Sequence, residues 1–312
     1  MKKLIIIILT VLSSNLKSYS QSGRIFDFLH NDASARSAAM GGATLTVVDD
    51  PTMLHYNPAL INTIISQQVS FCFFKHLLDI NSGTLFYGNN FEGIGKLGAG
   101  VNYINYGSFK RTDKNGVIQG DFGANDLAFT IGYGTYLNDE ISVGLSSKLI
   151  FSNIDNYSTS AIALDGGLFY QDTLRRLQVG VSILNLGTQL SKINDKSEDL
   201  PIDLRVGVSH QLKGLPLFVA LNFTRLLDNN DEFFNRFSYF NIGGEFKISN
   251  PIRLRFGYNN KVRSDVSFGE SKELAGFSGG FGLIIQEYRI DYGFNSFSRL
   301  GSLHRISINV KL

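Results

Sequence analysis

The sequence contains a single cysteine, Cys72, among its 312 residues. One cysteine excludes an intramolecular disulfide framework and every metal site built from several cysteines. The five histidines are scattered along the chain, and no two have the spacing that places two ring nitrogens on one ion. We therefore predict no metal site and no cofactor.

The sequence also has no excess of basic over acidic residues that would suggest a nucleic-acid partner. The formal net charge is +2, and it falls to about −1 when the three lysines of the amino-terminal leader, residues 1–20, are removed. A chain without a basic surface gives no support for a nucleic-acid partner, and we expect none.

Long apolar runs are absent after residue 20. Before it, Lys2 and Lys3 precede an apolar run from Leu4 to Leu12, and small residues lead up to Ser20. This is the layout of a secretory signal peptide with cleavage after Ser20. The run is too short for a membrane anchor, since a spanning helix needs about twenty apolar residues. We predict residues 1–20 to be a signal peptide.

Glycine and aromatic residues are plentiful instead, with 32 glycines and 12% aromatics, although tryptophan is absent. The mean hydropathy is close to zero, at +0.02. Without spanning helices, such a composition is typical of a large soluble β protein or of a β-barrel in lipid.

A period of two runs through most of the chain. In the stretch 141–151, apolar side chains alternate with small or polar ones, and Ser147 and Ile150 are the two exceptions. This period is the signature of a strand with one apolar face. It predicts fourteen strands: Val69–Phe74, Thr84–Phe91, Leu97–Tyr103, Leu127–Tyr133, Ile141–Phe151, Ile162–Tyr170, Leu177–Ile183, Ile202–Val208, Leu217–Phe223, Phe240–Ile248, Ile252–Tyr258, Phe277–Ile285, Tyr288–Phe294 and Ile306–Leu312.

The length of the segments and their polar faces favour a barrel in a membrane. Several segments reach about nine to eleven residues, which is what a tilted strand needs to cross a bilayer. Charges of both signs crowd the polar face of the last strands, and we expect them in a narrow lumen: Arg253, Arg255, Glu287, Arg289 and Asp291. The fold class is therefore all-β, a closed 14-stranded antiparallel transmembrane β-barrel. The solvated face of a soluble sandwich is the alternative.

Short and long connections alternate along the predicted strands, as they do in outer-membrane barrels. The longest are 108–123, 188–200, 227–236 and 260–274. In the loop around Phe233 and Phe234, with Asp231 and Glu232 before them, exposed aromatic side chains favour a partner-docking site. Anchoring of these phenylalanines in the outer leaflet is the alternative.

The stretch 34–61 lacks the alternation and differs from everything that follows. Asp50-Pro51 is a good helix start, and Asn57-Pro58 ends that short helix. Small residues dominate 33–42, so this part of the chain can pack tightly in a narrow space. We predict a plug segment over 21–65 inside a barrel formed by 66–312. A strap outside the lumen is the alternative.

Two sequences in this stretch carry a family resemblance, "SARSAAMGGA" and "DDPTMLHYNPAL". They resemble the amino-terminal signature of the PorV/PorQ family of Bacteroidetes outer-membrane proteins, which are themselves similar to the FadL fatty-acid transporters with a plugged barrel. The modest length looks more like the PorQ branch. The residues that carry the resemblance are Ser34, Arg36, Met40, Gly41, Gly42, Asp50, Pro51, Asn57, Pro58 and Ala59.

The resemblance implies a non-enzymatic role in type IX secretion. In this role the barrel sits in outer-membrane lipid and anchors a PorZ-like surface protein. Together with the PorU and PorV subunits, the attachment complex fixes cargo to lipopolysaccharide. The alternative is FadL-like uptake of hydrophobic small molecules, which requires an apolar cavity where the sequence predicts charges.

No arrangement of residues favours an enzyme. The sequence contains no GxSxG motif, and its glycine-rich stretches are typical of strand glycines. Ser209 and His210 are neighbours on a predicted strand, so their side chains point to opposite faces and cannot form a nucleophile–base pair.

Overall fold

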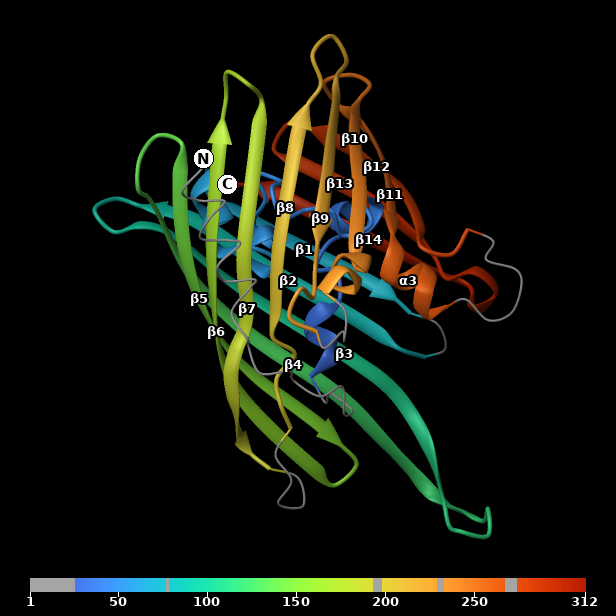
Figure 1. The fold of residues 1–312 in the computed structure, drawn as a ribbon. Coiled ribbons are helices and arrows are strands. Elements are labelled where there is room, and N and C mark those ends of the chain that lie inside the picture. Colours follow the sequence, from blue (N-terminus) through green and yellow to red (C-terminus); the bar gives the residue numbers. More distant parts are fainter. Residues whose placement is uncertain (1–25, 77–78, 193–197, 229–232, 267–273) are drawn as a thin grey trace.

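The computed structural model describes residues 26–76, 79–192, 198–228, 233–266 and 274–312. Fourteen strands within these ranges form one closed barrel in which every neighbouring pair is antiparallel (Figure 1). The strands are β1 (Gln68–Lys75), β2 (Asn81–Phe91), β3 (Gly95–Thr112), β4 (Ile118–Tyr136), β5 (Ile141–Ile154), β6 (Tyr157–Asp172), β7 (Leu177–Ser191), β8 (Asp203–Gln211), β9 (Leu217–Phe223), β10 (Phe240–Lys247), β11 (Ile252–Asn259), β12 (Phe277–Ile285), β13 (Tyr288–Ser296) and β14 (Ser302–Lys311).

The last strand closes the barrel against the first. β14 pairs with β1 from Gln68↔Lys311 to Lys75↔His304. Closure gives every strand two hydrogen-bonded neighbours, which the hydrocarbon layer demands because it offers no water to an open edge. The predicted fold class, a closed 14-stranded antiparallel barrel, is confirmed.

The outer wall is apolar and the inner wall is polar. On β5, Leu145 points outward and is 69% exposed, whereas its neighbour Ser146 points inward and is 4% exposed. Ile131 and Thr130 on β4 repeat the contrast, at 68% and 3%. This is the reverse of a soluble protein, and it makes the outer surface a lipid-facing one. The chain is thus an outer-membrane β-barrel.

No helix in the described ranges is long and apolar enough to cross a membrane.

The two ends of the barrel differ. The end that carries the connections 92–94, 137–140, 173–176, 212–216, 248–251 and 286–287 is called the turn end below. The opposite end, the loop end, carries the longest connections, 224–239 and 260–276, with the helices η4 (Phe233–Ser238) and α3 (Asn260–Asp265). Short turns face the periplasm in barrels of this kind, so the loop end is the outer one.

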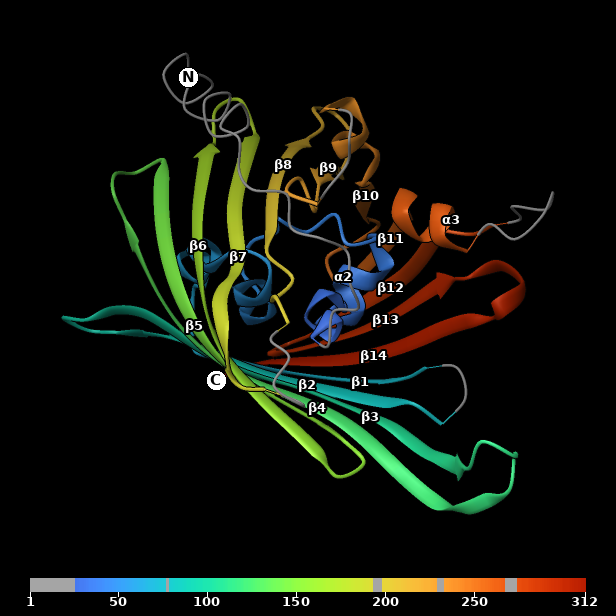
Figure 2. The same ribbon diagram turned by 60° about the horizontal axis from the view of Figure 1, so that its bottom comes forward.

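Several strands run further than the alternation predicts. β3 and β4 have 18 and 19 residues, whereas β9 has 7. They extend through most of the predicted loop 108–123 and leave only 113–117 between them. Pairing of β3 with β2 ends at Asn81↔Asn105, so residues 106–123 project as a two-stranded ribbon at the loop end (Figures 1 and 2). Above the membrane both faces are wet, so the alternation ends before the strand does.

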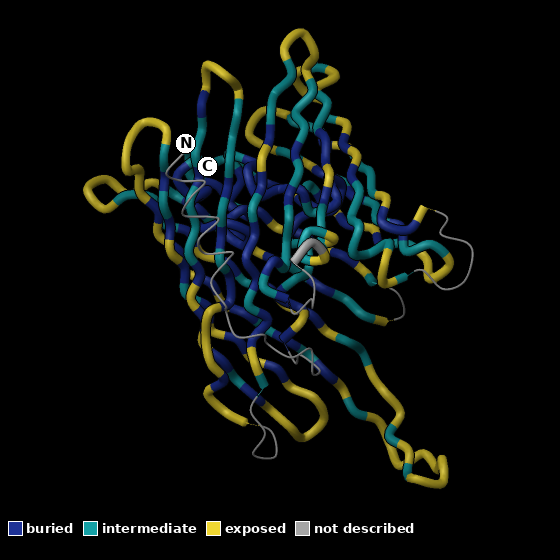
Figure 3. Tube along the Cα trace, viewed as in Figure 1, coloured by how far each residue is buried: buried dark blue, intermediate teal, exposed yellow. Residues whose placement is uncertain are grey.

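Residues 26–67, called the plug segment below, lie inside the barrel and are mostly buried (Figures 2 and 3). They form four short helices: η1 (Asp27–His30), α2 (Ala35–Ala39), η2 (Pro51–His55) and η3 (Pro58–Thr63). Residues 21–25 of the predicted plug, and the whole predicted signal peptide, lie outside the described residues.

Side chains at the N-caps start three of these helices: the start at Asp50-Pro51 was predicted, whereas Asn57-Pro58, which was predicted only to end that helix, also begins η3. Ser34 accepts the amide hydrogen of Ser37 at 3.2 Å, and Asp50 accepts that of Thr52 at 3.0 Å. Asn57 accepts the amide hydrogen of Ala59 at 3.1 Å. Pro51 and Pro58 occupy the first helical positions, where a missing donor is tolerated.

Candidate functional site in the plugged lumen

Glycines on the inner wall let the backbone of the plug segment approach the strands. A Cβ atom added to Gly257 on β11 would lie 2.2 Å from the carbonyl carbon of Met40. One added to Gly144 on β5 would lie 2.4 Å from that of Pro58. No side chain can be accommodated at these distances, so the plug segment docks backbone against backbone at both places.

The glycine pair of the plug segment has a conformational role as well. Gly41 and Gly42 have φ values of +64° and +79°, which side-chain-bearing residues rarely adopt. A Cβ atom on Gly41 would lie 2.8 Å from the amide nitrogen of Tyr258. These glycines end α2 and turn the chain while it touches β11.

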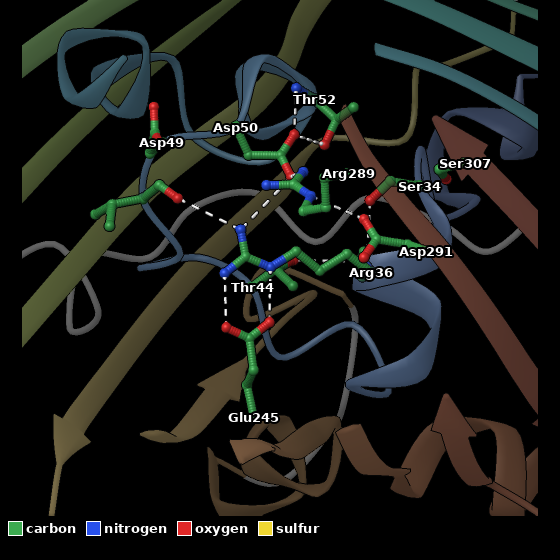
Figure 4. A network of polar contacts seen from close by, with 12 residues as sticks. Ser34, Arg36, Thr44, Asp49, Asp50, Thr52, Glu245, Arg289, Asp291 and Ser307 are labelled. Carbon is green, nitrogen blue, oxygen red and sulfur yellow. Dashed lines mark hydrogen bonds and ion pairs between the residues drawn. The ribbon is translucent and has the colours of Figure 1, made fainter. Parts of the chain in front are cut away.

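Six charged side chains join the plug segment to the wall in a closed ring of alternating sign, and Figure 4 labels all of them except Arg255. Two come from the plug segment and four from strands β10, β11 and β13. In ring order they are Arg36, Asp50, Arg289, Asp291, Arg255 and Glu245. We call this set the ion ring.

The contacts within the ion ring are short and directional. Arg36 binds both oxygens of Glu245, with Nε–Oε2 and Nη2–Oε1 distances of 3.0 and 3.1 Å (Figure 4). Arg255 donates from Nε to Glu245 at 2.6 Å and from Nη1 to Asp291 at 2.7 Å. Arg289 donates to Asp291 at 2.9 Å and also binds Asp50. Contacts in which one guanidinium donates two hydrogen bonds fix the relative orientation of the groups as well as their distance.

The ion ring is nearly dry. None of its six side chains exposes more than 14% of its surface. Burial alone would raise the pKa of Asp50, but the charges of Arg289 and Arg36 and the hydrogen bonds from Thr52 lower it below its usual value. Asp50 therefore stays ionised, and the three carboxylates balance the three guanidinium groups.

Three of the five predicted lumen charges, Arg255, Arg289 and Asp291, belong to the ion ring. Arg253 instead turns to the turn end, where its Nη1 donates to the carbonyl of Ser249 at 2.6 Å. Glu287 does not face the lumen: it lies exposed in the connection between β12 and β13. The period-two pattern of β13 continues by one residue into the two-residue turn before it, which is why the sequence analysis placed Glu287 in the lumen.

Other predicted plug residues also contact the wall. Asn57 donates from Nδ2 to the carbonyl of Leu168 at 3.1 Å, and Met40 and Ala59 lie in the buried apolar core of the plug. The sequence analysis missed Asn62, whose Nδ2 lies 3.1 Å from both the Thr135 and the Val143 carbonyls. Nothing in its position within the predicted plug segment, 21–65, distinguished it from its neighbours.

The inner wall also carries an apolar patch, which the sequence analysis did not predict, and it lies on the same strands as the buried ion pair of Lys148 and Asp165. Inward-facing residues of β3 to β6 form an apolar patch near the loop end: Ile104, Ala128, Ile150, Ala161 and Ala163. Phe26, Phe28 and Leu29 of the plug segment cover this patch and are at most 7% exposed. Ile150, an exception to the alternation, is thus part of a second lining.

One cavity lies on each side of the plug segment. The cavity at the turn end has a volume of about 400 Å³ and is bordered by Arg36, Glu245 and Arg176. The cavity at the loop end has a volume of about 520 Å³ and reaches from Tyr56 to Lys261 on α3. Among the described residues, no group of three or more histidine, cysteine, aspartate or glutamate side chains is placed to hold a metal ion.

The predicted docking loop is only partly described. Asp231 and Glu232 lie outside the described residues, and Phe233 and Phe234 are the first two residues of η4. Its role as a docking site stays a prediction.

Fold and lumen together define a plugged 14-stranded outer-membrane barrel, and solved structures share this architecture. The chain is similar to the Ralstonia pickettii toluene transporter TbuX, with a TM-score of 0.60, 15% identity and coverage of 89% of this chain and 98% of that one. It is similar to the Pseudomonas putida toluene transporter TodX, with a TM-score of 0.55, 15% identity and coverage of 92% and 98%.

A Pseudomonas aeruginosa FadL homologue gives a TM-score of 0.53 at 11% identity, with coverage of 90% and 98%. These likenesses make the fold FadL-like. No family model matches the chain. No curated protein sequence matches it either.

Proposed function

We propose that the protein admits apolar small molecules through the outer membrane. The observation that carries this proposal is the apolar patch inside the lumen near the outer end. Phe26 and Phe28 cover it, and an apolar molecule that displaced them would bury the same surface. The toluene transporters with the same fold support this reading, as their names state their cargo.

Passage requires the plug segment to move at one side while it stays attached at the other. The contact of Phe26 and Phe28 with the patch is apolar and non-directional. The contact of Arg36 and Asp50 with β10 and β13 is ionic and directional. Moving residues 26–30 away from the patch while the ion ring stays intact should therefore cost less free energy than breaking the ion ring.

Uptake of radiolabelled toluene by cells that express the protein tests this proposal. We expect uptake above that of cells with an empty vector, and its loss in Ile150→Asn, which puts an amide into the patch. Ile118→Asn is the matched control, since Ile118 is 60% exposed on the projecting ribbon. Uptake equal to that of the empty vector, with the barrel present in the membrane, contradicts the proposal.

A second candidate is the non-enzymatic platform for a surface protein that the PorV/PorQ resemblance implies. The projecting ribbon favours it. Phe109 and Phe122 stack on this ribbon with ring centroids 5.4 Å apart, and Val117 and Ile118 are 59% and 60% exposed near its tip. Apolar side chains outside the membrane are costly unless a partner covers them. A PorZ-like protein, with PorU and PorV subunits, is the partner class.

Affinity purification from native outer membranes in mild detergent tests the platform role. We expect a surface protein to accompany the tagged barrel and to be lost in a Val117→Ser, Ile118→Ser double variant. The control is Leu174→Ser, which changes a residue that is 91% exposed at the turn end. Recovery of the barrel alone, from wild-type cells, counts against this function.

A further inference from the structure

The cavity at the loop end is lined by charges of both signs, and most of them are already paired. Arg205 lies 2.7 Å from Asp203, and Lys261 lies 2.7 Å from Asp265. Arg225 lies 3.8 Å from Asp27. These pairs leave little net field in the cavity, because each cation has its own carboxylate.

Two charges in the same cavity have no ionic partner within 4 Å among the described residues: Asp32 of the plug segment and Arg305 of β14. Both also border a smaller cavity of about 50 Å³ beside it, so they face a common space. The carboxylate of Asp32 accepts hydrogen bonds from the Ser37 and Tyr56 hydroxyls, at 2.7 and 3.3 Å. No cation of the described residues lies within 4 Å of it.

Arg305 is buried and only partly satisfied. The residue is 4% exposed, and its Nε has no hydrogen-bond partner among the described residues. Its Nη1 donates to the side chain of Asn295, and the guanidinium lies 4.6 Å from the centre of the Phe74 ring. A buried guanidinium held by one amide and one ring is a costly arrangement unless an anion completes it.

We propose that this cavity binds a zwitterion of the amino-acid class, with its carboxylate at Arg305 and its ammonium group at Asp32. The site takes a different class of ligand from the apolar patch, although Ile80 of its lining also packs against the apolar cluster. The two protein charges are opposite in sign, and their ligand counterparts are carried on neighbouring atoms of one molecule.

Ligands with one charge fit less well for an electrostatic reason. A simple anion at Arg305 meets the repulsion of Asp32, and a simple cation at Asp32 meets that of Arg305. A zwitterion with the stated orientation attracts both. The cavity also offers apolar surface for a side chain, at Ile80, Val262 and Leu303.

Three matched probes test the proposal by isothermal titration calorimetry on the full chain in detergent. They are L-phenylalanine, 3-phenylpropionate, which lacks the ammonium group, and 2-phenylethylamine, which lacks the carboxylate. We expect L-phenylalanine to bind at least about tenfold more tightly than either analogue, because a polar site rejects the analogue that leaves its charge unpaired.

Two variants assign the ends of the ligand. Arg305→Gln and Asp32→Asn should each weaken binding of L-phenylalanine about tenfold or more. Asp32→Asn should also bring 3-phenylpropionate close to L-phenylalanine, and Arg305→Gln should do so for 2-phenylethylamine. Lys110→Gln is the control, since Lys110 pairs with Asp121 on the exposed ribbon. Heat-modifiable migration on a gel checks folding.

The wild-type series alone can overturn the proposal, even where a variant does not fold. Equal binding of 3-phenylpropionate and L-phenylalanine would make this an anion site, and equal binding of 2-phenylethylamine would make it a cation site. Absence of heat from L-phenylalanine at millimolar concentration would remove the site altogether. None of these outcomes bears on toluene uptake, which depends on the apolar patch.

Discussion

Two contacts between the plug segment and the barrel wall, the ion ring and the apolar patch, differ in their physics. Toward β10 to β13, six buried charges form the ion ring, and their contacts specify both distance and angle. Toward β3 to β6, Phe26, Phe28 and Leu29 lie on a patch of isoleucine and alanine. Such a surface accepts any apolar group of suitable size, because the hydrophobic effect has no direction.

The difference teaches which part of the plug segment is positioned and which part can be replaced. A buried ion pair adds little net stability over an apolar contact, but removal of one partner is expensive. The ion ring therefore fixes α2 and η2 in one place. Displacing Phe26 and Phe28 from the apolar patch exposes only apolar surface, and an apolar molecule bound in their place buries that surface again.

The largest expected effect comes from breaking the charged side within the wall. Arg255→Gln leaves Glu245 and Asp291 buried without their shared cation, which should lower the free energy of unfolding by about 3–5 kcal/mol. Urea titration of the purified barrel measures this. Arg111→Gln removes a partly exposed ion pair with Asp155 and should cost no more than about 1 kcal/mol. Equal losses of stability in the two variants would contradict the conclusion that the ion ring fixes the plug segment.

The sequence predicted the wall of this molecule better than its lumen. All fourteen predicted segments are strands, because a period of two is a local property that each segment displays by itself. The ion ring depends on which residues of distant strands meet. Arg36 and Asp50 stood out in the motif, yet Glu245, 209 residues after Arg36, was not among the candidates.

The apolar patch also depends on contacts between residues far apart in the sequence, which the sequence analysis could not predict. Ile150 was noted as a break in the alternation of its strand, and the sequence offered no reason for it. The reason is a neighbour far away in the chain, Phe26, which is fully buried in the same apolar cluster. An inward apolar residue in a membrane strand is a signal for a second lining, but one such residue does not identify its partner.

The apolar side should give the next largest effect, and a more local one. Phe26→Ala removes a ring that is fully buried and should cost about 3 kcal/mol, with the effect confined to residues 26–30. Hydrogen exchange followed by mass spectrometry can resolve this. We expect faster exchange over η1 and unchanged exchange over η2, which Asp50 ties to the ion ring. Faster exchange over both would mean that the two sides move together.

A smaller effect should follow from adding one methyl group at the charged side. In Gly257→Ala the new Cβ would meet backbone atoms of Met40 and Gly41 at 2.2 and 2.3 Å, which should cost about 1–3 kcal/mol. Gly279→Ala, on the neighbouring strand, meets its nearest atom at 3.6 Å and is the matched control. Single-channel conductance in planar bilayers should rise in the first variant, as α2 lifts from β11. Unchanged conductance would show that the plug segment accommodates the methyl group.

The smallest expected effect is the change of the free energy of unfolding with pH. It arises from a histidine of the plug segment and not from the ion ring. Burial, together with the charges of Lys148 and Arg205, holds the pKa of His55 well below 6.5. The unfolded chain therefore takes up a proton as the pH falls through 6.5, whereas the folded chain does not, so stability is lost on acidification. Between pH 7.5 and pH 6 this amounts to about 1 kcal/mol. Asp50, with a lowered pKa, contributes nothing in this range. His55→Gln should reduce the slope measured by urea titration, and the remaining part belongs to His30 and His76, whose pKa values burial also lowers. An unchanged slope in this variant would contradict the assignment to His55.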